Sequence, residues 1–101
     1  MATLLVLSAT VLGAGDQDPA EQTVLGRLAF VEPSLRRISV VPDGEVRMSE
    51  LFVDDDTDLR QGDRVLTLSD LVIEVGRRVT VRYRIDGDRR IAESIIVDPP
   101  G

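Results

Sequence analysis

The clearest structural signal lies in residues 78–97, which read RVTVRYRIDGDRRIAESIIV. Apolar residues alternate with polar ones in the first half, as in a β-strand with one buried face. Its inward positions are expected to be Val79, Val81, Tyr83 and Ile85. Asp86-Gly87 predicts a two-residue hairpin turn, because glycine tolerates the positive φ that such turns need. A partner strand at about 89–97 then completes a hairpin.

The same alternation occurs three more times upstream, which predicts strands at about 23–31, 35–41 and 45–54. The turns between them are expected at Glu32-Pro33-Ser34 and Pro42-Asp43-Gly44. Gly26 indicates a bulge or sharp bend. The inward face of the first strand is expected to carry Val24, Gly26, Leu28 and Phe30. A change of phase near Ser49-Glu50 indicates another bulge.

The long connection, residues 54–76, contains the sequence signs of one short helix. Thr67-x-x-Asp70 or Ser69 is expected to cap it, and Gly76 to end it. The helix would place Leu71, Val72 and Val75 over the sheet. Three strands, a helical turn and a closing hairpin follow the order of an OB-type barrel. We therefore predict an all-β domain at 23–98: a closed or partly open five-stranded OB-like barrel with one short helix between strands 3 and 4.

The amino-acid composition excludes several chemistries. The 101 residues include no cysteine and no histidine, so disulfides and Ser-His or Cys-His catalysis are absent. A carrier of Cu(I) or Ag(I) would need soft thioether, thiolate or imidazole donors, and Met48 is the one such donor after the N-terminal apolar segment. We therefore expect a protein that is not an enzyme and has no cofactor.

Residues 1–15, MATLLVLSATVLGAG, resemble a signal peptide. An apolar run ends in small residues that suit cleavage near Ala14 or Gly15, and it is too short for a permanent membrane span. Residues 16–22 are then a polar tether. No basic residue precedes the run, so an N-terminal core strand or helix stays open as the alternative. Export predicts a periplasmic or secreted protein without a stable membrane span.

A spaced pattern extends over residues 23–97. Its parts are Gly26-x-Leu-x-Phe-Val31, Ile38-x-Val40, Asp56-Thr57, Leu71 ahead of Gly76-x-x-Val79-x-Val81-x-Tyr83, and Ala92-x-x-Ile95-x-Val97. The pattern resembles an uncharacterised family of exported bacterial domains of unknown function. The resemblance implies a small OB-like β-barrel behind a signal peptide, with no catalytic residues to carry over. Arg77 departs from the family, in which an acidic residue commonly follows the glycine.

The acidic run DDDTD at 54–58 is the candidate for a metal site. Asp54, Asp56 and Asp58 have the alternate spacing of a calcium loop. Leu59, however, stands where the sharp-turn glycine belongs, and Val65 stands where the bidentate glutamate belongs. The competing interpretation is a solvated strand end whose side chains cap local N–H groups.

Four arginines on neighbouring predicted strands form a candidate ligand face: Arg27, Arg37, Arg82 and Arg84. Binding of single-stranded nucleic acid also needs stacked aromatic rings, and Phe30 and Tyr83 are assigned to the core. The net charge of −6 disfavours nucleic acid as well. The competing interpretation is a set of arginines paired with Asp and Glu on a solvated sheet face.

The function that follows from these observations is that of an exported, non-enzymatic module of the cell envelope. Its role would be structural or protein-binding, in contact with another envelope protein. The alternative is a barrel that binds a small ligand or a divalent cation through the acidic run or the arginine face.

Overall fold

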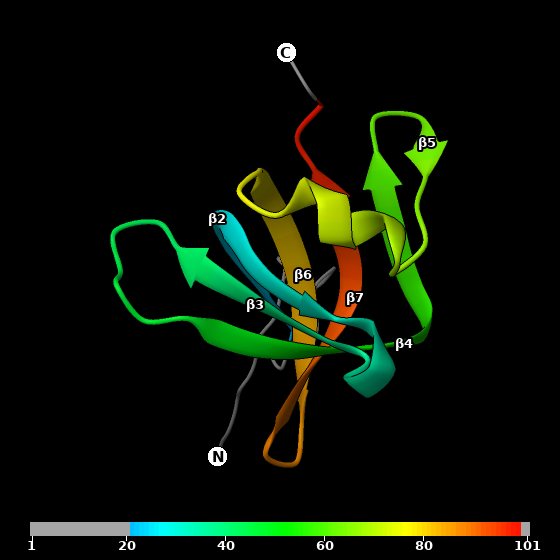
Figure 1. The fold of residues 1–101 in the computed structure, drawn as a ribbon. Coiled ribbons are helices and arrows are strands. Elements are labelled where there is room, and N and C mark those ends of the chain that lie inside the picture. Colours follow the sequence, from blue (N-terminus) through cyan, green and yellow to red (C-terminus); the bar gives the residue numbers. More distant parts are fainter. Residues whose placement is uncertain (1–20, 100–101) are drawn as a thin grey trace, which may run out of the picture.

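The computed structural model describes residues 21–99, which form six strands and two 3-10 helices (Figure 1). In chain order these are β2 Glu21–Glu32, η3 Pro33–Leu35, β3 Arg37–Pro42, β4 Ser49–Gln61, β5 Arg64–Val65, η4 Asp70–Glu74, β6 Arg78–Asp86 and β7 Arg89–Val97. The expected leader and residues 16–20 of the tether lie outside the described residues. Glu21 and Gln22, assigned to the tether, belong to β2. None of the helices formed by residues 21–99 has the length and hydropathy to span a membrane.

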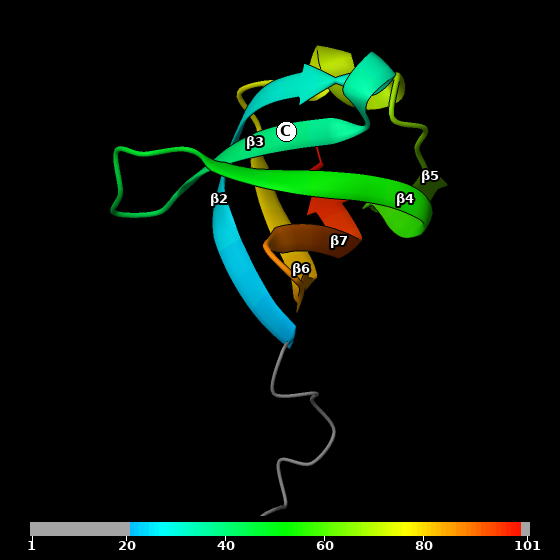
Figure 2. The same cartoon turned by 90° about the horizontal axis from the view of Figure 1, so that it is seen from below.

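The strands close into a barrel. The sheet has the order β3-β2-β6-β7-β4-β5, and an additional β3–β4 pairing joins its ends (Figure 2). All pairs are antiparallel except β4–β7, which is parallel. Five strands therefore make the closed barrel, and the two-residue β5 only extends the end of β4. This is the five-stranded OB-like barrel that the alternation predicts, with a short helix between its third and fourth strands.

The core is aliphatic, as the shortage of aromatic residues requires. Its fully buried side chains come from every barrel strand and from η4: Leu28, Ile38, Leu51, Leu71, Ile95, Val40, Val79, Val81 and Val97. Branched aliphatic side chains suit this layer because they pack well on a pleated surface. Leu71 of η4 is completely buried and closes one end of the barrel. Figure 1 shows η4 lying across that end.

The cap of η4 agrees with the sequence pattern. The amide of Thr67 donates to Asp70 Oδ2 at 2.8 Å, and the amide of Asp70 donates to Thr67 Oγ1 at 3.1 Å. These reciprocal bonds form a capping box. Gly76 follows with a φ of +98°. Only part of the expected apolar face is buried, however, because Val72 and Val75 are exposed while Leu71 is not.

The expected position of Phe30 in the core is wrong. The β2–β3 register shifts between Leu28 and Phe30, so Ala29 forms a bulge. One additional residue reverses the inward and outward sides of a strand. Phe30 is therefore 55% exposed, and Val31 packs against the core instead. Tyr83 does pack against the core, with its hydroxyl 3.1 Å from Gln22 Oε1, whereas Ile85 is exposed.

The third strand begins later and runs further than expected. Residues 43–48 form a projecting loop, and Val46 in this loop is 96% exposed. Its β-turn at Pro42–Glu45 has the expected Gly44 at positive φ, but it opens a longer loop, not a tight hairpin. The second hairpin also differs by one residue. Asp86 pairs with Arg89, so its two-residue turn is Gly87-Asp88.

Candidate functional site

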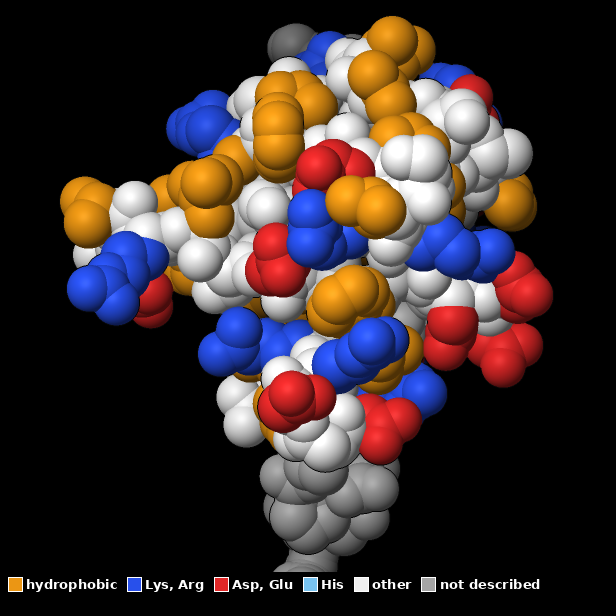
Figure 3. All heavy atoms as spheres, turned by 60° about the horizontal axis from the view of Figure 1, so that its bottom comes forward, with side chains coloured by type: hydrophobic (Ala, Val, Ile, Leu, Met, Phe, Trp, Pro, Cys, Tyr) orange, Lys and Arg blue, Asp and Glu red, His pale blue; other side chains and the backbone are white. Residues whose placement is uncertain are grey.

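A hollow open to solvent lies where η3, β4 and the start of β7 meet. Its volume is about 420 Å³. Its lining combines apolar, basic and acidic side chains: Leu35, Arg36, Phe52, Val53, Asp54, Asp55, Arg89 and Ile91. Figure 3, in which this lower end of the barrel turns forward, shows charged and apolar side chains interspersed without a large patch of one kind. A hollow of this size and composition could hold a small polar molecule with an apolar part.

Strand pairing brings these distant residues together. Phe52 of β4 lies opposite Arg37 of β3 on one side and opposite Ile91 of β7 on the other. The turn η3 immediately precedes β3, and Arg89 is the first residue of β7. Closing the barrel therefore places the η3 turn and the β6–β7 hairpin on either side of Phe52.

Phe52 and Arg89 make the most specific contact in the hollow. Arg89 Cζ lies 4.7 Å from the centroid of the Phe52 ring, which is a cation–π distance. The Phe52 ring is half-buried, and its contact restricts the flexible side chain of Arg89. A cation–π contact involves the charge of the guanidinium and not its N–H donors as hydrogen-bond donors, so these donors can bind a ligand.

Arg36 is anchored more firmly on the opposite side. Arg36 has a φ of 52°, and its backbone amide donates to Pro33 O and so closes the η3 turn. The Arg36 carbonyl accepts a hydrogen bond from the Val53 amide at 2.9 Å, and its Nε donates to Val53 O at 3.3 Å. Its Nη2 also forms an ion pair with Asp55. These three contacts with Val53 and Asp55 fix the turn against β4.

The acidic run is a bulge within β4. Between paired positions, β4 advances from Val53 to Asp58 while β7 advances only from Ala92 to Ser94. Thr57 holds the additional residues, because its Oγ1 accepts from the Asp54 amide at 3.0 Å and donates to Ala92 O at 2.7 Å. The Asp56 amide in turn donates to Asp54 Oδ1 at 2.9 Å. This is the local capping that the competing interpretation of the run describes.

The three candidate metal ligands do not converge in this bulge. Asp54 caps the bulge and lies 3.7 Å from Arg84, and Asp58 accepts from Arg60 Nε at 2.9 Å. Asp56 is exposed. Within residues 21–99, no three His, Cys, Asp or Glu side chains are grouped so that they could hold a metal ion.

The four arginines of the predicted ligand face are spread over the barrel. Arg82 and Arg84 lie on β6 opposite Thr23 and Glu21, whereas Arg27 lies further along β2, opposite Arg78. Arg37 is opposite Glu32 at the far end of β2. The four therefore do not line the hollow, and their role as a ligand face stays a prediction.

Each of these arginines has a partner in the barrel. Arg37 binds Glu32 at 2.7 Å, and the hydrogen bond from its Nε raises the pKa of Arg37. Arg84 lies 3.4 Å from Glu93, and Arg82 lies 3.7 Å from Glu21. Arg27 instead donates to the Gly76 carbonyl at 2.9 Å. Paired arginines of this kind fit the solvated-face interpretation.

The sequence interpretation did not identify the residues that matter most in the hollow. The sequence pattern predicts no ligand-binding role for Phe52, Arg89 or Arg36, although all three line the hollow. The available signal was Phe52, an aromatic residue one position out of phase with Leu51 and Val53. Residues on the outer side of a strand are expected to be polar, so an aromatic residue there can indicate a binding surface.

No family model and no curated relative matches the sequence. Several solved structures of CusF from Escherichia coli match the fold. The Cu(II) form of a tryptophan-to-alanine variant of CusF has a TM-score of 0.61 at 13% identity, covering 80% of this chain and 95% of that one. The Ag(I) form of CusF has a TM-score of 0.61 at 13% identity, covering 78% and 99%.

The fold is thus that of an OB-type barrel with a mixed polar and apolar hollow on one side. At this low identity, the likeness to CusF concerns the fold alone. The OB-like architecture implied by the family resemblance is confirmed, whereas membership of that family stays a prediction.

Proposed function

We propose that this chain is a non-enzymatic OB barrel that binds a small molecule in the hollow between η3, β4 and β7. The observation that carries the proposal is the position of the hollow. OB barrels bind ligands on the face of their second and third strands, between the loops that join strands 1–2 and 4–5. Here those elements are β3, β4, η3 and the β6–β7 hairpin, and three of them contribute lining residues to the hollow.

We do not expect this barrel to bind a soft metal ion, although CusF structures hold such ions. Two of the matching CusF structures hold Cu(II) or Ag(I). This sequence has no Cys and no His, and Met48 stands alone on the projecting loop. One thioether does not provide the several soft donors that such ions need. Binding of a divalent cation has less support than binding of an organic ligand, because Asp54 caps the bulge and Asp58 is bound to Arg60.

A substitution that fills the hollow tests the proposal. Leu35→Trp adds bulk at a lining side chain that is 52% exposed, so the core should not change. The matched control is Leu25→Trp, at a β2 side chain that is 50% exposed and does not line the hollow. Amide-resolved NMR titrations would use D-glucose, D-glucuronate, phenylacetate and calcium chloride as probes.

We expect at least one organic probe to shift the amides of residues 35–36, 52–55 and 89–91 in the wild type and in Leu25→Trp, but roughly tenfold more weakly in Leu35→Trp. If none of the organic probes shifts these amides, the proposal fails. Shifts confined to residues 54–58 with calcium would instead support the divalent-cation alternative.

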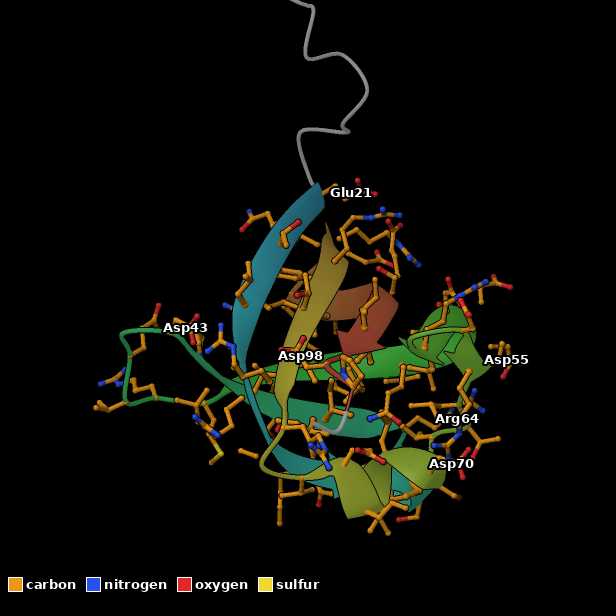
Figure 4. All side chains as sticks on the ribbon, turned by 90° about the horizontal axis from the view of Figure 1, so that it is seen from above. Glu21, Asp43, Asp55, Arg64, Asp70 and Asp98 are labelled. Carbon is orange, nitrogen blue, oxygen red and sulfur yellow. The ribbon has the colours of Figure 1, made fainter. Side chains whose placement is uncertain are left out.

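A protein-binding role is the second candidate, and the loop at 43–48 favours it. Val46 and Met48 on this loop are 96% and 60% exposed, so the loop presents two apolar side chains that a partner could cover. The loop projects from the barrel on the side away from Asp55 (Figure 4). A partner captured from envelope extract by the wild type and lost with Val46→Asp would support this role.

Export to the periplasm or the medium is part of the proposal. Its support is the apolar segment at residues 1–15, which lies outside the described residues. Intact-mass measurement of the exported protein should show a chain that starts near Asp16. A mass that includes Met1 would contradict export by signal-peptide cleavage.

A further inference from the structure

Two arginines line the hollow, and of these Arg89 is the one that has no anionic partner within the described residues. Within residues 21–99 its side chain makes no ion pair and no hydrogen bond, and it contacts the Phe52 ring with Cζ 4.7 Å from the ring centroid. A guanidinium presents five N–H donors in a rigid planar fork. The cation–π contact with the ring uses the charge of the guanidinium and none of its N–H donors in a hydrogen bond, so these donors are open to a ligand.

The other charges of the hollow are already matched. Arg36 forms an ion pair with Asp55, and Arg84 Nη2 lies 3.7 Å from Asp54 Oδ2. Asp54 also accepts a hydrogen bond from the Asp56 amide. The remaining local charge is therefore the single positive charge of Arg89, which favours an anionic ligand group.

The surroundings favour an anion with one negative charge. The chain carries a net charge of −6, and Asp54 and Asp55 line the same hollow. Arg89 supplies one unmatched positive charge, so the second negative charge of a dianion such as phosphate would have no partner in the hollow. A carboxylate also matches the guanidinium fork with two parallel hydrogen bonds.

The apolar part of the lining indicates the rest of the ligand. Leu35, Phe52 and Ile91 contribute hydrocarbon surface to the hollow. We propose that the hollow takes a small amphipathic monocarboxylate, whose carboxylate is bound by Arg89 and whose carbon skeleton packs on these three side chains. This inference rests on the proposed function, because it assigns a ligand class to the same hollow.

A matched pair of probes tests the role of the carboxylate. Phenylacetate and phenylacetamide have nearly the same shape, and only the first carries a charge. We expect phenylacetate to shift the amides of residues 35–36, 52–55 and 89–91 at millimolar concentration, with phenylacetamide and inorganic phosphate each binding at least tenfold more weakly. The measurement is an NMR titration of the full chain.

Substitution of the arginine completes the test. Arg89→Gln should weaken phenylacetate binding roughly tenfold. The affinity of Arg89→Lys should lie between those of the wild type and Arg89→Gln, because lysine keeps the charge but lacks the planar fork of donors. Arg90→Gln is the control, since the Arg90 side chain is also exposed and lacks an ion pair or hydrogen bond in the described chain, but it does not line the hollow. Circular dichroism would verify that each variant folds.

The outcomes separate the two proposals. If phenylacetamide binds the hollow as tightly as phenylacetate, or if Arg89→Gln binds as the wild type does, the monocarboxylate inference is overturned while the hollow remains a binding site. If phosphate binds as tightly as phenylacetate, charge alone is recognised and the inference is likewise overturned. If no probe shifts the lining amides, the proposed function fails as well.

Discussion

Gly26 shows how one residue permits the closure of this barrel. It lies in β2 between Pro42 of β3 and Val79 of β6. A Cβ at Gly26 would stand 2.2 Å from the Val41 carbonyl oxygen and 2.8 Å from Pro42 Cα. Both are backbone atoms, so neither can move aside as the end of a side chain could. The glycine therefore allows the close approach of β2 and β3, which the sequence pattern indicated only as a bend.

Gly26→Ala should destabilise the protein by roughly 3 kcal/mol or more, since the new methyl group forces two paired strands apart. Gly62→Ala is the control. Nothing lies within 4 Å of a Cβ there, so only its φ of +62° opposes the substitution, at about 1 kcal/mol. Urea denaturation measures both free energies of unfolding. Equal losses for the two variants would contradict the assigned contact.

The 3-10 helix η4 illustrates what a short element contributes. Its apolar residues differ sharply in burial, because Leu71 is fully buried while Ile73 is 78% exposed. The C-terminal end of η4 is tied to β2, since the Gly76 amide donates to Leu28 O at 2.8 Å and the Leu28 amide donates to Arg77 O at 2.9 Å. The helix therefore covers one end of the barrel by inserting the Leu71 side chain into the core. Two backbone hydrogen bonds with Leu28 hold the end of the helix against β2.

Leu71→Ala should lower the free energy of unfolding by about 2–5 kcal/mol, because it leaves a cavity in a closed aliphatic core. Ile73→Ala, on the same helix, should change it by less than about 0.5 kcal/mol. Thermal or chemical denaturation of the two variants compares them directly. A large loss for Ile73→Ala would mean that the exposed face of η4 packs against another part of the chain.

Electrostatics of the whole molecule produce a dependence of stability on pH. The bidentate hydrogen bonds of Arg78, at 2.9 and 2.7 Å, lower the pKa of Asp43, and the backbone and side-chain hydrogen bonds of Thr67 lower the pKa of Asp70. A carboxyl group with a lowered pKa in the folded state binds fewer protons there than in the unfolded chain. Its contribution is present at neutral pH and is lost as the pH falls through the folded-state pKa.

The wild type should therefore lose stability as the pH falls below about 4. Asp70→Asn removes one of these carboxylates, so it should be less stable than the wild type at pH 7, with the difference shrinking toward pH 3. Asp43→Asn should behave in the same way through the Arg78 pair. Urea denaturation at several pH values checks both. If the difference in free energy of unfolding between the wild type and each variant did not change with pH, the charge of these carboxylates would make no contribution to stability.

Local signals accounted for the existence of the five barrel strands, because alternation depends on neighbouring residues, whereas the connections after Pro42 and Asp86 differ from the expected turns. The alternation at 78–97 predicted β6 and β7, and Thr67 and Asp70 predicted the cap of η4. The inward faces were less predictable. Bulges at Ala29 and within 54–57 exchange inward and outward positions, and no short-range signal marks where an additional residue is accommodated.

The sequence by itself determined the strand-rich architecture and the absence of imidazole and thiol chemistry, since alternation and residue type are local properties. Tertiary structure alone decided that Phe52, Arg89 and Arg36 line one hollow. The physical reason is that their proximity depends on the β3–β4 and β4–β7 registers, which are set only when the barrel closes. Pairing partners far apart in the chain are chosen by burial of the whole core, so the site emerges with the closed fold.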